Sequence, residues 1–529
     1  MAAGEFWSAE DCWVGRGRIR VQVSGLNPGD GRGGPEHVVT RRQTDVVVVG
    51  GGMAGLCASL AALEDHVQVI TLEKGSRAGG SMLRSGGRIW TFISKSVLRE
   101  KIPDGNIALQ DMVLDGHLEG LAWLEDHGAS LEAEQPFKDY GRGRAASPPD
   151  LTWTLESRLQ ALGGALELNM PMDALLYEDG VVRGVRVSSP GGIVDIEAGA
   201  VVLATGGFQG NPELLARHVT PHVDKVYLRA NPWSTGDGFL AATGIGAAVT
   251  PAMPAFYGHA LPAPPVSFGP KELRDMTQRH GHVSVAINLE GRRFTDESGG
   301  TGEEHVTQAM ALQRDATAVY IIDSDVAEAP SRHGPPRIII ERLRSRGGPV
   351  IERQTLEELC EALDSWGVAG ARALLTLREY NRALAVGQPD HLNPPRRGNR
   401  FPLTKPPFTA VLVRPGITFT HGGLEVDTEL RVLRRSSSSS TLPLAIAEHS
   451  EVKFRPIPNL YAAGTDVGNV SNAGYMGGLA TALVTGRRAG RGAAACARAQ
   501  KTAGRAEAGY ASECRVIPSG MGAEARSTS

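Results

Sequence analysis

The stretch TDVVVVGGGMAGLCASLAALEDHVQVITLEK, residues 44–74, decides the fold of this chain. Residues 46–49 are four valines in a row, which is typical of a buried strand in a parallel sheet. A glycine-rich turn, residues 50–55, follows at once. Residues 53–63 then predict a helix whose first N–H groups face a phosphate, and residues 67–72 predict a second strand. This order of strand, turn, helix and strand indicates a dinucleotide-binding site.

The glycines of the turn have separate roles in such a site. Gly50 permits the tight turn, Gly52 lets the backbone approach a pyrophosphate, and Gly55 lets the helix pack close to the strand. Glu73 follows about 20 residues later, where an acid accepts hydrogen bonds from a ribose hydroxyl. A carboxylate repels a 2′-phosphate, so the sequence favours FAD or NAD.

The composition excludes several classes of function. The chain has 529 residues, enough for two or three domains, and its 55 basic and 58 acidic side chains leave a net charge of −3. This near-balance argues against a nucleic-acid partner or a membrane-surface role. The five cysteines are scattered, with no CxxC pair, so we expect no metal site. The sequence has an acidic N-terminus and no apolar run of about 18 residues, so we expect no transmembrane segment and a cytoplasmic protein.

Hydrophobic periodicity predicts further strands and helices. Residues 181–187 and 193–198 indicate a hairpin that turns at 190–192. A second glycine-rich loop, residues 77–90, follows the second strand, where it is expected to lie over the cofactor. The other predicted strands are 200–204, 283–288 and 318–322, and the other predicted helices are 107–127, 153–162, 237–247, 355–366, 371–385 and 477–495.

The chain changes character twice. Prolines cluster from residue 251 to 265, and the segment up to about residue 401 mixes strands with helices. Signals of the nucleotide-binding domain resume at 420–424 and 460–464, so we interpret the middle segment as an inserted domain. Residues 434–451 include five serines in a row and predict a solvated loop. The expected parts are a partly disordered extension (1–43), a nucleotide-binding domain in two pieces (44–250 and 405–500), the inserted domain (251–404) and a polar tail (501–529).

Four motifs point together to one family. They are VVVVGGGMAG with Glu73, GGSMLRSGG at 79–87, VVLATGGF at 201–208, and the pair NLYAAGTD and GYMGGLATALVTGRRAG within 459–490. With these motifs the chain resembles the flavoprotein oxidoreductases grouped with the fumarate reductase and succinate dehydrogenase flavoprotein subunits, which include 3-ketosteroid dehydrogenases. The resemblance implies an α/β fold, with a Rossmann-like FAD-binding domain of parallel sheet and helices. It also implies that the inserted α+β domain is a capping domain that closes over the substrate.

The resemblance further implies that FAD is the cofactor. No histidine lies in 79–87, where succinate dehydrogenases attach flavin covalently, so we expect non-covalent FAD. Asp466 ends a predicted strand and can hold the ribityl chain, while the helix that begins near Gly478 can stabilise negative charge on the reduced ring. The residues expected to contact FAD are Gly50, Gly52, Met53, Ala54, Gly55, Glu73, Lys74, Gly79, Gly80, Ser81, Gly86, Gly87, Ala204, Thr205, Gly206, Gly464, Asp466, Gly478, Leu479 and Ala480.

The implied reaction is desaturation beside a carbonyl, or its reverse. A hydride passes between a substrate carbon and flavin N5, and a protein group moves the neighbouring proton. The chain lacks the arginine that fumarate reductases carry after their GKRF-type motif, because residues 298–301 are Ser-Gly-Gly-Thr. It has Tyr475 before the final glycine pair, and its GGSMLRSGGRIW loop resembles that of 3-ketosteroid dehydrogenases. A tyrosine there can donate to a carbonyl, take a proton when ionised, or merely pack on the flavin.

Three hypotheses stay open at this stage. The first is a 3-ketosteroid-dehydrogenase-like enzyme that uses Tyr475. The second is a reductase or dehydrogenase of small carboxylates that uses His421 with Arg292 or Arg293. However, a histidine in such a place is more often structural, and the sequence Glu-Gly-Arg-Arg favours a hairpin turn with exposed charge. The third is a flavin-binding protein without turnover. The first two imply a small-molecule substrate with an activated C–C bond and an unidentified electron donor or acceptor. Tyr257 and His259 are further candidates, but only because of their position at the entry to the inserted domain.

Overall fold

A mainly parallel sheet is built around the strand that the valine run predicts. The computed structural model describes residues 39–331, 333–436, 453–472 and 474–513, which all belong to one compact unit. Strand β1 pairs in parallel with β2 on one side and β9 on the other, and β17 and β6 extend the parallel arrangement outward. The sheet consists of β1 (Thr40–Val49), β2 (Val69–Glu73), β6 (Ala165–Leu168), β7 (Met172–Glu178), β8 (Val181–Ser189), β9 (Gly192–Leu203), β16 (Arg431–Arg435) and β17 (Phe454–Ala462).

Strand β1 begins earlier than the sequence predicts. Residues 46–49 are buried, as expected for a central parallel strand, but Thr40 and the residues after it also pair with β9. These first residues are largely exposed and polar, so they carry no hydrophobic signal, and the backbone pairing alone makes them a strand. The predicted N-terminal extension is therefore wrong for residues 40–43, and residues 1–38 lie outside the described part of the chain.

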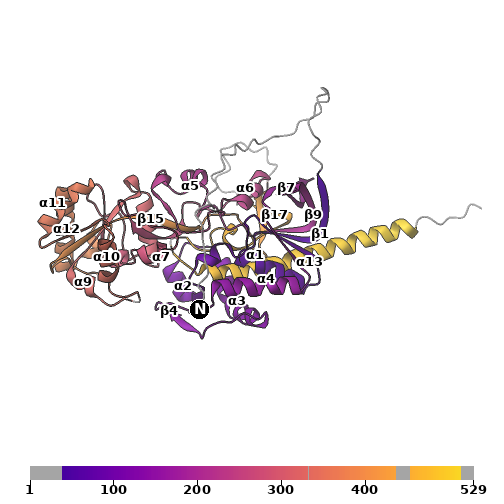
Figure 1. Cartoon of the computed structure of the whole chain (residues 1–529), viewed down its shortest axis with the longest axis horizontal. Helices are drawn as coiled ribbons and strands as arrows, with labels where there is room; N and C mark the ends of the chain where they lie inside the picture. The colour runs from indigo at the N-terminus through magenta and orange to yellow at the C-terminus, as the bar shows by residue number, and fades with distance from the viewer. Residues whose placement is uncertain (1–38, 332, 437–452, 473, 514–529) are drawn as a thin grey trace, which may run out of the picture. The chain divides into compact units, whose positions relative to one another are not determined.

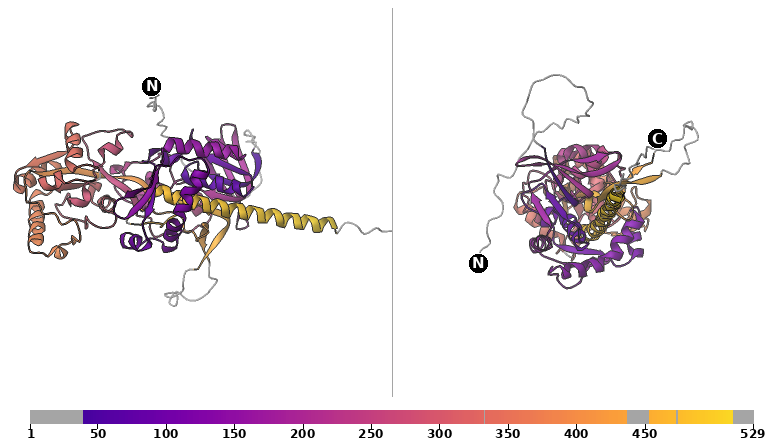
Figure 2. Two further views of the ribbon diagram at one scale, coloured as in Figure 1. Left: turned by 90° about the horizontal axis from the view of Figure 1, so that it is seen from below. Right: turned by 90° about the vertical axis from the view of Figure 1, so that its right-hand side faces the viewer.

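Two helices from distant parts of the sequence pack side by side next to this sheet. Helix α13 (Gly478–Glu513) runs alongside α1 (Met53–Glu64), as the yellow and indigo ribbons show (Figure 1; Figure 2). A Cβ on Gly486 would lie 2.4 Å from the Ala54 carbonyl oxygen, and one on Gly490 would lie 2.1 Å from that of Ala58. The small residues of α13 therefore allow close contact with α1. Helices α3 (Ile107–Asp126), α4 (Pro148–Ala161), α5 (Pro212–His218) and α6 (Asp237–Gly244) complete this part.

A second, mostly antiparallel sheet forms around the long strand β15 (Phe408–Thr420). Strands β11 (Phe256–Pro262), β12 (Val285–Asn288), β13 (Ala318–Ile322) and β14 (Val350–Arg353) join it, while β10 (Tyr227–Leu228) pairs with β15 in parallel. Its helices are α7 (Leu273–Met276), α8 (Glu303–Ala311), α9 (Ser324–Glu328), α10 (Pro336–Ser345), α11 (Leu356–Leu363) and α12 (Gly370–Ala385). This is the α+β arrangement expected of the inserted domain. Because β15 belongs to the second sheet, the two sheets do not divide at residue 404, and the domain boundaries stay a prediction.

Most other predicted elements are confirmed, with shifted ends. The hairpin is β8 with β9, and helices 107–127 and 371–385 match α3 and α12. Within the glycine-rich loop 77–90, residues 80–84 form a 3₁₀ turn and Arg88 begins β3 (Arg88–Phe92), which pairs with β5 (Gly141–Ala145) beside β4 (Gln135–Phe137), followed by α2 (Lys95–Lys101).

The C-terminal helix is longer than predicted. It continues to Glu513, so residues 501–513 are not a tail. Alanine, the strongest helix former, recurs through this segment. Residues 514–529 and most of the predicted serine loop, 437–452, lie outside the described residues. In the part of the chain that the structure describes, no helix is both long and apolar enough to cross a membrane.

Candidate active site

The glycines of the first turn divide into two that the fold needs and one that leaves room for a ligand. Gly50 has φ +113°, and a Cβ there would lie 2.2 Å from the Ala204 carbonyl oxygen. A Cβ on Gly55 would lie 1.7 Å from the Gly50 carbonyl oxygen. Gly52 has an extended backbone, and a Cβ there would meet no atom within 4 Å. The protein itself therefore does not require glycine at position 52, whereas a phosphate close to the backbone does.

The second glycine-rich loop packs directly against the first. The Gly79 N–H donates to the Gly51 carbonyl oxygen at 2.8 Å, and Gly80, with φ +50°, lies beside Gly52. In the described part of the chain, the buried Ser81 hydroxyl has no hydrogen-bond partner. Gly87 packs closely on Ala146, whereas a Cβ on Gly86 would enter open space.

Glu73 is held by the backbone at the end of β2. Its buried carboxylate accepts the Gly51 N–H at 2.9 Å through Oε2 and the Gly75 N–H at 2.7 Å through Oε1. These bonds fix the carboxylate and leave further lone pairs for a ribose hydroxyl. The Lys74 ammonium instead contacts Asp237 at 2.7 Å and Thr235 at 2.6 Å, so these two residues occupy the Lys74 side chain.

Asp466 joins the ends of β9 and β17. Its buried carboxylate accepts hydrogen bonds from the Thr205 N–H, from the Thr205 hydroxyl at 2.9 Å and from the Gly207 N–H at 3.3 Å. Burial raises the pKa of Asp466 to about 6, and the bonds from Thr205 and Gly207 offset part of that rise. Asp466 thus shapes the Ala204–Thr205–Gly206 turn, and a direct contact with the ribityl chain stays a prediction.

These features fit a dinucleotide such as FAD. No side chain caps the N-terminus of α1, so the first N–H groups, which include those of Met53 and Ala54, are suited to a pyrophosphate. The open space at Gly52 and Gly86 gives the backbone access to a ligand. The unpartnered Ser81 hydroxyl offers a polar contact, and Glu73 is placed for a ribose.

A cavity lies where β15, the loop after β17 and the first turn of α13 meet. Gly464, with φ +64°, and Gly478 lie on its wall, and Ala480 is fully buried in the turn behind it, next to the half-buried Leu479. The residues that line the cavity are Phe419, Thr420, His421, Gly464, Thr465, Val467, Val470, Ser471, Met476, Gly477, Gly478 and Thr481. This cavity therefore collects the predicted ring-binding glycines and His421.

His421 lies on the wall of this cavity as a neutral side chain. Its Nδ1 is 3.0 Å from the Ser471 hydroxyl, and Nε2 has no hydrogen-bond partner in the described part of the chain. Burial lowers the pKa of His421 to about 3. At neutral pH it is therefore uncharged, and a role as a cationic carboxylate ligand is not supported.

Tyr475 belongs to a group of aromatic rings beside the cavity. Its ring stacks on that of Tyr257 with centroids 3.9 Å apart, and the edge of Trp90 lies 5.4 Å away. The Gly478 N–H donates to the Tyr475 hydroxyl at 3.2 Å, while the Tyr475 N–H donates to the Thr301 hydroxyl at 3.1 Å. Thr301, in the segment where fumarate reductases carry arginine, thus fixes the backbone that presents Tyr475.

Three further residues lie behind Tyr475. The sequence analysis named Tyr257 and His259 for their position alone and did not name Glu303. The Tyr257 hydroxyl is 2.8 Å from His259 Nε2, and His259 Nδ1 is 3.4 Å from Glu303 Oε2. Tyr257 and His259 are two positions apart on β11, which places both side chains on one face of the strand. That alternation was visible in the sequence, but the contact with Glu303 at the start of α8 depends on tertiary packing.

Arg293 is not brought to the cavity. Its buried guanidinium binds Glu297, with Nε 2.9 Å from Oε1, and donates to the carbonyl oxygen of Pro394 at 2.6 Å. It also lies 5.5 Å from the Tyr380 ring centroid. The predicted hairpin turn exists, since Gly291 has φ +71° and the Asn288 N–H donates to the Arg292 carbonyl oxygen at 2.9 Å. Only Arg292 is exposed, so the expectation of two exposed charges is wrong for Arg293.

Replacing Arg293 by alanine tests this structural assignment. We expect the free energy of unfolding to fall by about 3–5 kcal/mol, because the change leaves Glu297 buried with one partner fewer. The rate per bound flavin should stay within a factor of about 2, because the Arg293 side chain does not reach the cavity and its loss should change the activation free energy by less than about 1 kcal/mol. Arg292→Ala is the matched control and should alter neither quantity. Urea unfolding and single-turnover flavin kinetics measure both, and a large loss of rate in Arg293→Ala with unchanged stability would contradict the assignment.

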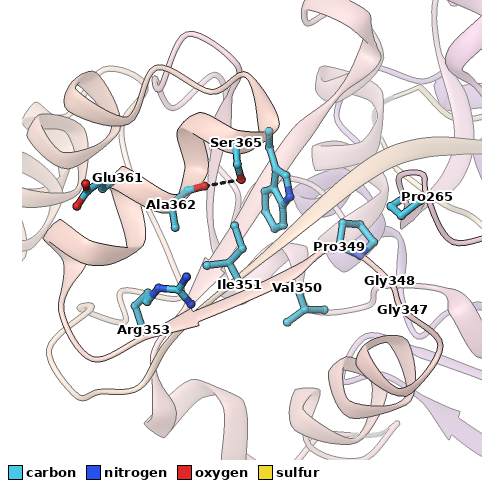
Figure 3. A pocket seen from close by; sticks show the side chains of 11 residues that line it. Pro265, Gly347, Gly348, Pro349, Val350, Ile351, Arg353, Glu361, Ala362 and Ser365 are labelled. Carbon is cyan, nitrogen blue, oxygen red and sulfur yellow. Dashed lines mark hydrogen bonds between the residues drawn. The ribbon is translucent and has the colours of Figure 1, made fainter.

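A larger cavity lies beside the second sheet, between β14 and the last turn of α11 with the 3₁₀ turn that follows it. Figure 3 shows Ile351 and Arg353 on the strand, with Ala362 and Ser365 opposite. The Ser365 hydroxyl donates to the Ala362 carbonyl oxygen at 2.7 Å. None of the predicted site residues lines this cavity, so we place the chemistry at the cavity beside α13.

Comparison with known proteins identifies the family of this chain. Residues 45–480 match the FAD binding domain family. A probable fumarate reductase, Ifc3, of Shewanella frigidimarina is 28% identical over 479 residues, covering 85% of this chain and 75% of that protein. A urocanate reductase of Eggerthella lenta is 26% identical, covering 88% and 76%. The structure of 3-ketosteroid delta1-dehydrogenase from Sterolibacterium denitrificans shares the fold, with a TM-score of 0.65, 20% identity and coverage of 86% and 100%.

The match spans most of the chain, including both turns and the start of α13. The two curated relatives are named as reductases, so the comparison favours an enzyme over a flavin-binding protein without turnover. The chain therefore belongs to the FAD-binding family of fumarate reductase and succinate dehydrogenase flavoproteins, and it is an FAD-dependent oxidoreductase that acts on CH–CH or C=C groups.

Proposed function

We propose that the enzyme transfers a hydride between flavin and the C–C bond next to a ketone, with an apolar cyclic enone or its saturated ketone as the substrate. The observation that carries this proposal is the position of the Tyr475 hydroxyl at the N-terminus of α13, beside the cavity. The bound FAD supplies the hydride acceptor or donor. The remaining task of the protein is to hold the carbonyl oxygen and to move one proton.

Tyr475 is suited to the first task. Burial raises the pKa of Tyr475, and the hydrogen bond from Gly478 offsets only part of that rise, so the phenol stays protonated at neutral pH. The Gly478 N–H polarises the hydroxyl by donating to its oxygen, which strengthens the bond that the hydroxyl hydrogen can make. Tyr475 therefore serves as a donor to a carbonyl oxygen on which charge develops.

The walls of the site favour an apolar substrate. Phe419, Val467, Val470 and Met476 line the cavity, and Phe419 lies against the first turn of α13, where a Cβ on Gly478 would be 3.1 Å from its ring. His421, the titratable side chain on this wall, is neutral. An uncharged ketone can therefore bind against this wall without burying an unpaired charge.

A second candidate function is the reduction of an α,β-unsaturated acid. The half-buried Arg229 donates to the Thr418 hydroxyl at 3.0 Å and to the Thr277 hydroxyl at 3.3 Å, and it has no carboxylate partner in the described part of the chain. Burial lowers its pKa to about 10, which still leaves the guanidinium charged at neutral pH. A substrate carboxylate would supply the missing partner, and the similarity to fumarate and urocanate reductases supports this alternative.

Anaerobic flavin spectroscopy separates the two candidates. Oxidised enzyme mixed with 3-ketosteroids should lose its flavin absorbance, and photoreduced enzyme should be reoxidised by 2-cyclohexen-1-one or 4-androstene-3,17-dione. Arg229→Met should leave these rates nearly unchanged. Reoxidation by fumarate or urocanate alone, abolished by Arg229→Met, would instead establish the acid substrate and reject the ketone.

A further inference from the structure

Three side chains lie in a line that leads away from the candidate site, with one hydrogen bond and one close polar contact between them. It starts at Tyr257, whose ring stacks on Tyr475 at 3.9 Å, and passes to His259 and Glu303. His259 and Glu303 are buried, with 5% and 6% of their surface exposed. Within the described residues, His259 Nδ1 and Glu303 Oε2 have no hydrogen-bond partner. Two buried polar atoms that face each other at 3.4 Å and nothing else indicate a functional pair.

We propose that Tyr257 is the catalytic acid–base residue, and that His259 and Glu303 form a relay that gives and takes its proton. This inference rests on the proposed function for the identity of the reaction. In the line, Glu303 orients the imidazole through Nδ1–H, and His259 Nε2 accepts the hydrogen of the Tyr257 hydroxyl. The arrangement has the logic of an acid, a histidine and a hydroxyl that act as one unit.

The charge around Glu303 keeps its carboxylate ionised. Burial alone would raise the pKa of Glu303, but the interaction with the His259 imidazole and the charge of Arg279 are among the causes that hold the pKa below its usual range. Glu303 is also in the first turn of α8, where the helix dipole favours negative charge. The other charged groups that act on this cluster are Arg229, Lys138 and Glu304.

The resting histidine is neutral, which makes it a proton acceptor. Burial lowers the pKa of His259, and Glu303 restores only part of it. Burial also raises the pKa of Tyr257 well above its usual value, so a free phenolate is costly in this site. A tyrosine that must accept a proton therefore needs to lose its own hydrogen in the same step, and His259 Nε2 at 2.8 Å is the acceptor placed to take it.

The proton transfer balances in both directions. In desaturation, the substrate loses a hydride from one carbon to FAD and a proton from the carbon beside the carbonyl, and a C=C bond forms. That proton goes to the Tyr257 oxygen while the Tyr257 hydrogen moves to His259 Nε2, which leaves an imidazolium opposite the Glu303 carboxylate. In reduction, His259 returns its proton to Tyr257, and the Tyr257 hydrogen goes to the substrate carbon.

Tyr475 does not share this relay. Its oxygen accepts the Gly478 N–H, and the relay residues contact Tyr257 instead. The two stacked tyrosines thus divide the work: Tyr475 holds the carbonyl oxygen and Tyr257 moves the proton.

A buried metal ion is the competing use of the same atoms. His259, Glu303 and Glu304 offer ligand atoms that all lie within 4.8 Å of one another. Glu304, however, already accepts the Thr301 hydroxyl at 3.2 Å and lies 3.6 Å from the Lys138 ammonium. That cation neutralises the second carboxylate, so the cluster favours a proton relay over a divalent ion.

The variants Tyr257→Phe, His259→Gln and Glu303→Gln test the relay in the FAD-loaded enzyme. Tyr227→Phe is the matched control, since it removes a hydroxyl bound to the Pro262 carbonyl oxygen at 3.1 Å in the same sheet. With photoreduced enzyme and 2-cyclohexen-1-one, we expect Tyr257→Phe to slow reoxidation about 10²–10⁴-fold at unchanged Kd for the enone. His259→Gln and Glu303→Gln should slow it about 10-fold or more and lower the solvent deuterium isotope effect, while Tyr227→Phe retains the wild-type rate.

A measurement without substrate tests the relay separately from the proposed function. In ¹⁵N-histidine NMR spectra of the oxidised holoenzyme, the signal lost in His259→Gln should show a protonated Nδ1 and an unprotonated Nε2, and Glu303→Gln should shift it. The opposite tautomer, a wild-type rate in Tyr257→Phe, or a stoichiometric divalent ion whose removal abolishes turnover would overturn the relay. If the wild-type enzyme reduces no enone while the tautomer is as expected, the proposed function fails and the relay stands.

Discussion

Replacing Tyr475 by phenylalanine lowers kcat/KM for an enone by about 10²–10³-fold, which is the usual cost of removing one donor to a developing oxyanion. The expected loss follows from the protonated hydroxyl at the α13 N-terminus, which phenylalanine lacks. The ring stacks on Tyr257 and Trp90 are kept, so the flavin site retains its shape. Stopped-flow reduction of the bound flavin under anaerobic conditions measures the effect.

The binding of FAD by this variant is the control. FAD content and visible spectrum should match those of the wild-type enzyme, because phenylalanine keeps the ring that packs against Tyr257 and Trp90. Flavin reduction at the wild-type rate in Tyr475→Phe would show that the tyrosine only packs against the ring. In that case the carbonyl would need another donor, and the ketone assignment would lose its main support.

Replacing Gly52 by valine yields a folded protein that takes up no FAD. A side chain at position 52 enters open space in the protein, and the extended backbone there suits any residue. The loss of a glycine at the start of α1 costs the helix at most about 1 kcal/mol. The same side chain, however, occupies the approach to the α1 N-terminus where the pyrophosphate binds. Circular dichroism of the apoprotein and titration with FAD separate folding from uptake.

Gly55→Ala is the matched comparison and should behave in the opposite way. Its Cβ would lie 1.7 Å from the Gly50 carbonyl oxygen, so α1 must move away from β1. We expect a loss of stability of about 3 kcal/mol or more even without FAD. Equal apoprotein stability of the two variants, or normal FAD uptake by Gly52→Val, would refute the division of the glycines into structural and ligand-facing positions.

The local parts of the fold were predictable because the signals are local. The valine run, the glycine turn and Glu73 lie within one short segment, and each of them has a distinct steric or hydrogen-bonding requirement. The same holds for the hairpin of β8 and β9, whose turn residues are adjacent in sequence. The start of β1 was missed because exposed polar residues become a strand only through their pairing with β9.

The catalytic side was harder to predict because its residues come from separate elements. Tyr257 and His259 are on β11, Glu303 begins α8, and Tyr475 precedes α13, so only tertiary packing joins them. Arg293 shows the converse error. Its sequence position favoured a surface turn or a substrate ligand, whereas Glu297 and the carbonyl oxygen of Pro394 bind the guanidinium in the interior. The sequence shows which chemical groups a side chain offers, but the folded structure decides which partner that side chain binds.

The close packing of α13 on α1 has a consequence for biosynthesis. The pyrophosphate turn is translated long before Gly464, Gly478 and the helix that packs on α1 through Gly486. A nascent chain therefore has only half of its coenzyme groove until α13 has left the ribosome. Coenzyme loading accordingly has to wait for α13, and chains that end before α13 remain empty and leave the buried face of α1 uncovered.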